Sequence, residues 1–263
     1  MDLQLRGRTA LVTGGSRGIG RAIARALAGE GVRVAICART PEALTATADE
    51  LSEATGTKVL GVVADMGDRA QIVAMVERVV AELGTVDVLV NNAATAAGRT
   101  APPKLAEITR DALVREIDVK VLGYLFAAQA VVPGMQAAGW GRIINIAGLA
   151  ARTTGSTIGS IRNAGVAVLT KNLADELGPS GIAVTCVHPG LTRTVRSAEV
   201  SDPAEAARVA RIEEQIPRIN SMRRMIDDSD LGPLVAFLAS PHGFVLNGSI
   251  IDAGGGQPGP IHY

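Results

Sequence analysis

Cysteine and histidine are scarce in this 263-residue sequence, which contains two cysteines and three histidines. Cys37 and Cys186 cannot form a disulfide framework, and this favours a protein of the reduced, cytoplasmic compartment. The histidines, at positions 188, 242 and 262, have no cysteine or carboxylate at ligand spacing, so the sequence predicts no metal site. Disulfide-stabilised and metal-dependent proteins are therefore not expected.

An excess of charge and a long apolar run are also missing. Lys and Arg number 26, and so do Asp and Glu, so no positive field attracts a nucleic acid. The most apolar long run, 121–135, is interrupted by glycine, glutamine and proline, and it is shorter than the roughly 18 residues that suggest a membrane span. The expected partner is therefore a small molecule, with no nucleic acid and no membrane.

Apolar residues are abundant, at 47%, and short apolar runs alternate with longer helix-like stretches. The short runs predict seven strands, at 9–14, 32–38, 58–64, 86–92, 142–148, 182–190 and 249–255. The longer stretches predict helices at 21–31, 41–55, 68–84, from about 111, and at 158–178. This alternation predicts an α/β fold, a single doubly wound Rossmann-like domain over 1–263 with a seven-stranded parallel sheet and helices on both faces. A polar, irregular stretch at about 191–227 is interpreted as a substrate flap.

Glycines cluster between the first predicted strand and the first predicted helix. Gly14, Gly18 and Gly20 allow a tight turn and a close approach of the backbone to a pyrophosphate, whose charge the helix N-terminus would receive. An ordinary glycine-rich turn is the alternative interpretation. The position directly after a strand and before a helix favours a dinucleotide site.

The end of the second strand distinguishes NAD(H) from NADP(H). An NAD site places an acidic residue about 20 residues beyond the glycines, whereas residues 37–40 here are Cys-Ala-Arg-Thr. Arg39, together with Arg17 inside the glycine turn, offers two guanidinium groups to a 2′-phosphate. Either arginine could instead be a solvated surface charge. The sequence favours NADP(H) over NAD(H).

With these features the sequence resembles the short-chain dehydrogenase/reductase family, in its 3-oxoacyl-ACP reductase-like branch, over nearly the whole chain. Further matching segments are Asp65-Met66, Asn91–Ala94, Pro189-Gly190 with Thr192 and Thr194, and Asp252–Gly255. The resemblance implies hydride transfer between NADP(H) and an alcohol or carbonyl, and a homo-oligomer, either tetramer or dimer. Together with the turn, it implies cofactor contacts from Gly14, Ser16, Arg17, Gly18, Ile19, Gly20, Arg39, Thr40, Asp65, Met66, Asn92, Ala93, Ala94, Asn163, Pro189, Gly190, Thr192 and Thr194.

The resemblance fails at the residues that carry the chemistry. Members of that family usually use Ser, Tyr, Lys and Asn, and the tyrosine transfers the proton of the substrate oxygen. The corresponding positions hold Gly148, Gly159, Asn163 and Lys120. Glycine cannot donate a proton, so the usual general acid is missing and ordinary ketone reduction is expected to be slow. Asn163 can still hydrogen-bond a ribose hydroxyl.

Two nearby residues are candidate catalytic replacements. Lys120 and Tyr124 are four residues apart and share a helix face, so either could carry the proton. The alternative is a core tyrosine beside a cofactor-facing or solvated lysine. Ser156, Ser160 and Arg162 could orient a carbonyl, or could instead cap the helix and pack against a neighbouring subunit.

Two functions of different classes follow from these observations. The leading hypothesis is an NADP(H)-dependent oxidoreductase with a non-standard catalytic site, acting on an alcohol, a carbonyl or an activated alkene. The alternative is a catalytically inactive NADP(H)-binding protein that acts as a redox sensor or structural partner. His188, beside a predicted strand end, is interpreted as a structural residue rather than an acid–base group.

Overall fold

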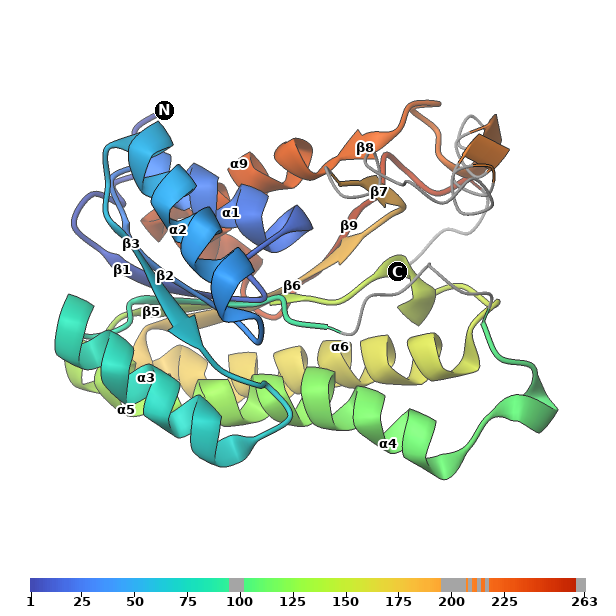
Figure 1. The fold of residues 1–263 in the computed structure, drawn as a ribbon, viewed down its shortest axis with the longest axis horizontal. Coiled ribbons are helices and arrows are strands. Elements are labelled where there is room, and N and C mark those ends of the chain that lie inside the picture. The colour runs from blue at the N-terminus through green and yellow to red at the C-terminus, as the bar shows by residue number, and fades with distance from the viewer. Residues whose placement is uncertain (95–101, 195–206, 208–209, 212–213, 216–217, 259–263) are drawn as a thin grey trace.

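A parallel sheet of seven strands, in the order β3-β2-β1-β4-β5-β6-β9, forms the centre of the fold (Figure 1). This computed structural model describes residues 1–94, 102–194, 207, 210–211, 214–215 and 218–258. The strands are β1 Thr9–Thr13, β2 Arg33–Ala38, β3 Val59–Val63, β4 Val88–Asn91, β5 Gly141–Ile146, β6 Ile182–Pro189 and β9 Ile250–Ala253. The predicted doubly wound parallel sheet is confirmed, and β1 and β4 lie side by side where the strand order reverses.

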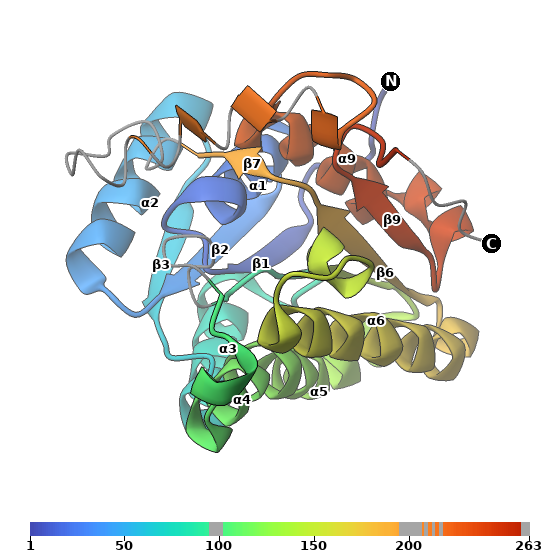
Figure 2. The same ribbon diagram turned by 90° about the vertical axis from the view of Figure 1, so that its right-hand side faces the viewer.

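Helices cover both faces of the sheet (Figure 2). One layer holds α1 Gly18–Gly29, α2 Pro41–Thr55 and α9 Asp228–Ala239, and the other holds α3 Arg69–Leu83, α5 Gly123–Ala138 and α6 Thr157–Leu177. Ala10 and Val12 of β1 pack in the first layer's core, whereas Leu11 between them packs in the second. Because both faces are buried, the strands read as continuous apolar runs.

The helix predicted from about residue 111 contains a change of winding. It consists of α4 Arg110–Ile117, a π-helical turn over Asp118–Leu122, and then α5. Lys120 lies in the middle of the π-helical turn. Such turns are rare and occur frequently at functional sites.

The sequence patterns did not predict α9. Gly232 and Pro233 lie in its interior and disfavour a helix on local propensity. Packing explains the outcome, because a Cβ at Gly232 would lie only 2.9 Å from Cβ of Ala26 in α1. The helix start does carry a local signal, since the Asp230 carboxylate accepts a hydrogen bond from the backbone N–H of Asp227 at 3.0 Å.

The predicted flap at about 191–227 falls largely outside the described residues. Its two described ends pair with each other as a small parallel sheet, formed by β7 Thr192–Arg193 and β8 Ile226–Asp227. The flap therefore stays a prediction.

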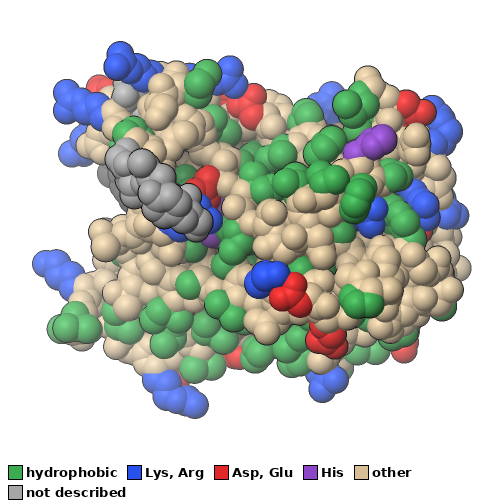
Figure 3. All heavy atoms as spheres, turned by 180° about the vertical axis from the view of Figure 1, so that it is seen from behind, with side chains coloured by type: hydrophobic (Ala, Val, Ile, Leu, Met, Phe, Trp, Pro, Cys, Tyr) green, Lys and Arg blue, Asp and Glu red, His purple; other side chains and the backbone are tan. Residues whose placement is uncertain are grey.

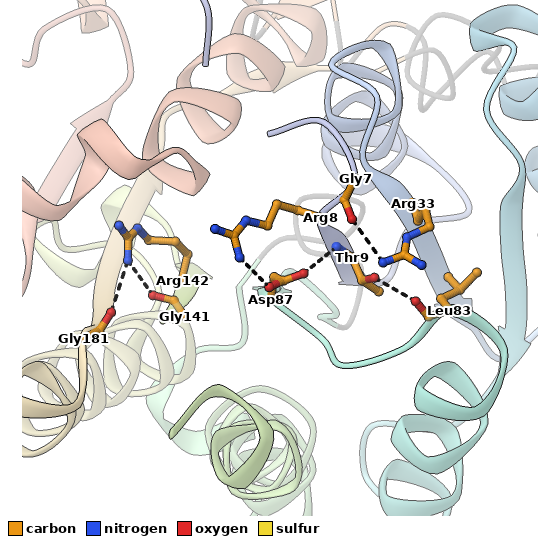
Figure 4. Close-up of polar contacts among 9 residues, drawn as sticks. All are labelled: Gly7, Arg8, Thr9, Arg33, Leu83, Asp87, Gly141, Arg142 and Gly181. Atoms are coloured by element: carbon orange, nitrogen blue, oxygen red, sulfur yellow. Dashed lines mark hydrogen bonds and ion pairs between the residues drawn. The ribbon is translucent and has the colours of Figure 1, made fainter. Parts of the chain in front are cut away.

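Hydrogen bonds close the amino-terminal edge of the sheet (Figure 4). Asp87 accepts from Nη1 of Arg8 at 3.0 Å and from the backbone N–H of Thr9 at 2.8 Å. The Arg142 side chain donates to four backbone carbonyls, those of Gly141, Gly181, Ser240 and Pro241. Burial, reinforced by the charge of Arg8, lowers the pKa of Arg142 to about 10. This edge is occupied by internal contacts, so the opposite, carboxyl edge is the place to seek a site.

Candidate functional site

The glycine turn between β1 and α1 is packed so closely that side chains do not fit. Gly14 and Gly18 have φ values of +66° and +53°, in the left-handed region that favours glycine. A Cβ at Gly20 would overlap the carbonyl oxygen of Gly14 and lie 2.5 Å from Nδ2 of Asn92. The turn therefore requires glycine at these positions for physical reasons.

Asn92 and Thr13 join this turn to the end of β4. Nδ2 of Asn92 donates to the carbonyl oxygens of Thr13 at 3.0 Å and Gly14 at 3.2 Å. In return, Oγ1 of Thr13 accepts from the backbone N–H groups of Asn92 and Ala93, at 2.9 and 3.0 Å. The ends of the two central strands are thus held together, and Asn92 and Ala93 lie beside the glycines as predicted for a common site.

The N-terminus of α1 is suited to an anion. Its N-cap residue, Arg17, makes no side-chain capping hydrogen bond, so side-chain capping does not occupy the first backbone N–H groups. The turn is tied to the second strand, because the N–H of Gly15 donates to the carbonyl of Cys37 at 3.1 Å. Arg17 and Arg39 are both exposed and come from these two neighbouring segments. The residues present therefore fit a dinucleotide phosphate.

The remaining predicted cofactor residues lie around the same edge of the sheet. Asp65 and Met66 follow β3, whose end is tied to β2 by the hydrogen bond from Ala64 N to Ala38 O at 3.1 Å. A Cβ on Gly18 would lie 3.2 Å from Cγ2 of Thr194, so the segment after β6 returns to the glycine turn. The other predicted cofactor residues lie along the same edge and differ in exposure. Half-buried are Ser16 and Ile19 in the turn and Gly190 and Thr192 after β6. Thr40 and Ala94 are exposed, and Pro189 is buried.

Gly148, Gly159 and Asn163, to which the family resemblance assigns the catalytic positions, lie after β5 and in the first two turns of α6. A Cβ on Gly148 would lie 3.1 Å from Nδ2 of Asn163, so these two positions are in contact. Asn163 is 3% exposed, and its Oδ1 has no hydrogen-bond partner in the described part of the chain. A Cβ on Gly159 would lie 2.8 Å from Oγ of Ser156. The buried, unpartnered oxygen is available to a ligand hydroxyl.

Lys120 reaches this region from the π-helical turn. Its Nζ donates to the carbonyl oxygen of Ala147 at 2.8 Å, directly before Gly148. The side chain is buried, and burial lowers the pKa of Lys120 to about 8, with the nearby Cys186 acting weakly in the opposite direction. The ammonium and amine forms therefore coexist near neutral pH.

Tyr124 is differently placed. Its hydroxyl donates to the carbonyl oxygen of Ile146 at 3.0 Å, and the side chain is fully buried in a cluster with Ala147, Val166 and Cys186. Burial raises the pKa of Tyr124 well above its usual value. Tyr124 and Lys120 thus donate to neighbouring backbone carbonyls at the end of β5, and Tyr124 in addition packs in an apolar cluster.

The polar residues at the start of α6 have structural partners. Oγ of Ser156 caps the helix by accepting from the N–H of Gly159 at 3.1 Å, and Oγ of Ser160 donates to Thr153 O at 3.1 Å. Arg162 pairs with Glu116 of α4 in the same chain, and its packing against a neighbouring subunit stays a prediction.

The sequence did not predict the group formed by His188, Asp252 and Arg152. Nη1 of Arg152 lies 2.7 Å from Oδ2 of Asp252, whose Oδ1 lies 3.5 Å from Nδ1 of His188. His188 is 1% exposed, and neither ring nitrogen has a hydrogen-bond partner among the described residues. The ring is therefore buried without the hydrogen bonds that a structural histidine usually makes. Burial lowers its pKa to about 4 despite Asp252, so the ring is neutral at pH 7. The register of β6 and β9 pairs His188 with Asp252, and the sequence alone does not give that register.

A cavity of about 240 Å³ opens beside these residues, at the carboxyl ends of β6 and β9. Leu149 and Thr153 line it from the segment after β5, and Gly190 and Leu191 line it from the end of β6. The remaining walls come from residues 219–220 and from Gly254 and Gln257. The glycine turn, the positions that the family resemblance assigns to catalysis and this cavity therefore share one edge of the sheet, where open α/β sheets bind ligands.

Comparisons with known proteins agree with this arrangement. The family model for short chain dehydrogenases matches residues 8–205. The chain is 33% identical over 260 residues to the oxidoreductase UcpA of Escherichia coli, covering 97% of each chain. It is 34% identical over 254 residues to (2S)-[(R)-hydroxy(phenyl)methyl]succinyl-CoA dehydrogenase subunit BbsD of Thauera aromatica, covering 96% of this chain and 97% of BbsD. The solved structure of L-sorbose reductase from Gluconobacter frateurii, complexed with NADPH and L-sorbose, superposes with a TM-score of 0.91 at 28% identity, over 99% of this chain and 100% of that one.

The two ends of α1 provide a matched test of the turn. We expect Gly20→Ala to lower the free energy of unfolding by about 1–3 kcal/mol, because the added methyl overlaps backbone, and to weaken NADPH binding. Gly29→Ala meets nothing within 4 Å and should be neutral or stabilising by up to about 1 kcal/mol. Urea unfolding and calorimetry measure both effects. Equal behaviour of the two variants would contradict the close packing of the turn.

Proposed function

The chain belongs to the short-chain dehydrogenase family, and we propose that it is an NADP(H)-dependent oxidoreductase that acts on an alcohol or carbonyl through a non-standard catalytic site. The observation that carries this proposal is the shared carboxyl edge of the sheet, which holds both the glycine turn bound by Asn92 and the cavity lined by Leu149 and Gly190. Binding and chemistry thus have adjacent sites on rigid elements.

Residues of this chain have distinct roles in the proposed reaction. NADPH, when bound, supplies the hydride. The backbone N–H groups at the start of α1 would bind its pyrophosphate, and Oδ1 of Asn163 would accept a hydrogen bond from a ribose hydroxyl. Lys120 holds the proton that the substrate oxygen takes up, because its buried Nζ lies at the carbonyl of Ala147, directly before Gly148. Tyr124 supports the end of β5 and positions the backbone that Lys120 contacts.

The preference for NADP(H) rests on charge at the end of β2. Arg17 and Arg39 are exposed on neighbouring segments, and no carboxylate occurs at 37–40. A 2′-phosphate gains charge-assisted hydrogen bonds there, whereas the ribose of NAD lacks the acidic partner that usually binds it. The similar L-sorbose reductase was solved with NADPH, which supports the same choice here.

Calorimetry measures this preference directly. We expect NADPH to bind at least about tenfold more tightly than NADH, a difference of about 1.4 kcal/mol, and Arg39→Ala to reduce that ratio. Arg25→Ala removes an equally exposed arginine from α1 and should leave the ratio unchanged. Equal affinities of the wild type for the two cofactors would refute the assignment.

The role of Lys120 predicts a pH dependence with a definite sign. The pKa of Lys120 is lowered to about 8, so its proton is present below that pH and lost above it. Carbonyl reduction should therefore fall by about tenfold per pH unit above about 8, and alcohol oxidation should rise through the same range. Steady-state rates across roughly pH 6–10 measure both directions, with ketones and aldehydes plus NADPH for reduction and the corresponding alcohols plus NADP⁺ for oxidation.

Variants separate the two candidate proton carriers. Lys120→Met should lower kcat by about 10²–10⁴-fold and remove the inflection, while NADPH affinity changes by no more than about threefold. Tyr124→Phe should keep the wild-type pH profile. Loss of activity in Tyr124→Phe with retention in Lys120→Met would assign the proton to the tyrosine instead.

We also propose that the protein is a homo-oligomer. The stretch Arg110–Ala138 has the length and apolar composition of a membrane span, yet in this fold α5 packs on α3, β4 and β5. Only 33% of its most apolar window is buried, and Val168 and Ile161 of α6 are 63% and 46% exposed. Figure 3 shows apolar side chains gathered along the layer that contains α6. A second copy of the chain would cover this surface.

Light scattering tests the assembly. We expect a mass that is a multiple of 27.0 kDa at micromolar concentration, and Val168→Glu should shift it toward the monomer. Val73→Glu, on the 40% exposed Val73 of α3, is the matched control and should leave the mass unchanged. A wild-type monomer throughout that range would contradict the proposal.

A further inference from the structure

The cavity at the carboxyl edge has an apolar side and a polar side. Leu149, Leu191 and Ile219 supply the apolar surface. Asn220 and Gln257 are the amide side chains among its lining residues, and Thr153 adds a hydroxyl. A volume of about 240 Å³ is at the small end for a ligand pocket, so a compact molecule fits it.

The amide groups offer hydrogen-bond acceptors that nothing in the described chain uses. Oδ1 of Asn220 and Oε1 of Gln257 are both buried and have no hydrogen-bond partner among the described residues. The orientation of the Asn220 amide is fixed, because its Nδ2 donates to the carbonyl oxygen of Arg224 at 2.7 Å. Asn220 is 7% exposed, so water does not readily satisfy its oxygen. A ligand that donates hydrogen bonds would give both amide oxygens a partner.

The polar side of the cavity is built on backbone pairing. The N–H of Ser221 donates to the carbonyl of Gly256 at 2.8 Å, and the N–H of Met222 donates to the carbonyl of Gly255 at 3.0 Å. These bonds hold the segment that contains Asn220 against the segment that contains Gln257. The two acceptors are thus kept on one side of the cavity, as recognition of a ligand with several donors requires.

Charge is absent from the lining. None of the residues that line the cavity in the described part of the chain is acidic, basic or histidine. Arg152 and Asp252, each within two residues of a lining residue in sequence, pair with each other at 2.7 Å. An anionic or cationic ligand would therefore leave water without a counterion, which disfavours carboxylates, phosphates and amines.

We propose that the cavity binds a small neutral polyhydroxylated substrate, a hydroxyketone in reduction or a polyol in oxidation, with Asn220 and Gln257 accepting hydrogen bonds from its hydroxyl groups. The carbon skeleton packs against Leu149, Leu191 and Ile219. A simple ketone only accepts hydrogen bonds, so it would leave both amide oxygens unpartnered. This inference rests on the proposed function and names the substrate class of that site.

A series of four-carbon ketones tests the proposal with the length of the carbon chain held constant. Erythrulose carries three hydroxyls, 2-butanone carries none, and 2-oxobutanoate carries a negative charge. With the NADPH-loaded protein we expect kcat/KM for erythrulose to exceed that for both others by at least about 100-fold. Equal or better turnover of 2-butanone would overturn the inference while leaving the proposed function intact.

Variants assign the preference to the two amide oxygens. Gln257→Met keeps the size of the side chain and removes the acceptor, and should lower the preference for erythrulose over 2-butanone at least about tenfold. Gln257→Glu keeps an acceptor oxygen and should retain more of the preference. Asn220→Leu should act like Gln257→Met, but it also removes the bond to Arg224, so Gln257 gives the cleaner result. Gln136→Met is the control, because this exposed residue lies near the end of α5 that leads into the opposite edge of the sheet.

A binding measurement keeps this inference separate from catalysis. Saturation-transfer NMR with the NADP⁺-loaded protein compares erythritol with 2-butanol, and erythritol should give the stronger signal, reduced in Gln257→Met. If erythritol binds in this way but no carbonyl is turned over, the substrate class stands and the proposed activity fails. If neither erythritol nor erythrulose binds more strongly than its deoxygenated counterpart, the inference is wrong.

Discussion

The two hydrogen bonds from the Asn92 amide to the β1–α1 turn are the interaction on which the cofactor side of the site depends. Gly14 and Gly18 give the turn its positive φ angles, but glycine also makes the unfolded chain more flexible, so a free turn would not hold one shape. Asn92 binds the turn's carbonyls, and Thr13 binds the backbone after β4 in return. The start of α1 is therefore presented in a fixed position at the point where the strand order reverses.

The two edges of the sheet differ in whether their polar groups have hydrogen-bond partners. At the amino edge Arg142 and Asp87 satisfy backbone groups from several segments, and the charges there have partners. At the carboxyl edge Asn163, His188 and Gln257 each keep a buried nitrogen or oxygen without a partner in the described chain. Buried polar atoms are normally hydrogen-bonded, so this contrast favours ligand binding at the second edge alone.

Burial determines the electrostatics of the candidate site. Burial lowers the pKa of Lys120 to about 8 and that of His188 to about 4, so positive charge is disfavoured on both. A lysine near its transition can release a proton to a substrate oxygen more readily than an ordinary surface lysine. The same dry surroundings suit a neutral substrate, which links the proposed chemistry to the proposed substrate class.

Local patterns in the sequence were sufficient to predict the parallel sheet, the glycine turn and helix 41–55. The signals for them, which are apolar periodicity, glycine spacing and a proline at a helix start, each act over a few residues. Other features depended on packing between distant segments. Helix α9 forms against α1 despite its glycine and proline, and Tyr124 meets the carbonyl of Ile146 rather than an open site. Arg152 and Asp252 are 100 residues apart in sequence, so no local signal predicts their contact. Spacing along a helix tells which residues share a face, but only the tertiary structure determines what that face touches, and therefore which side chains remain available for chemistry.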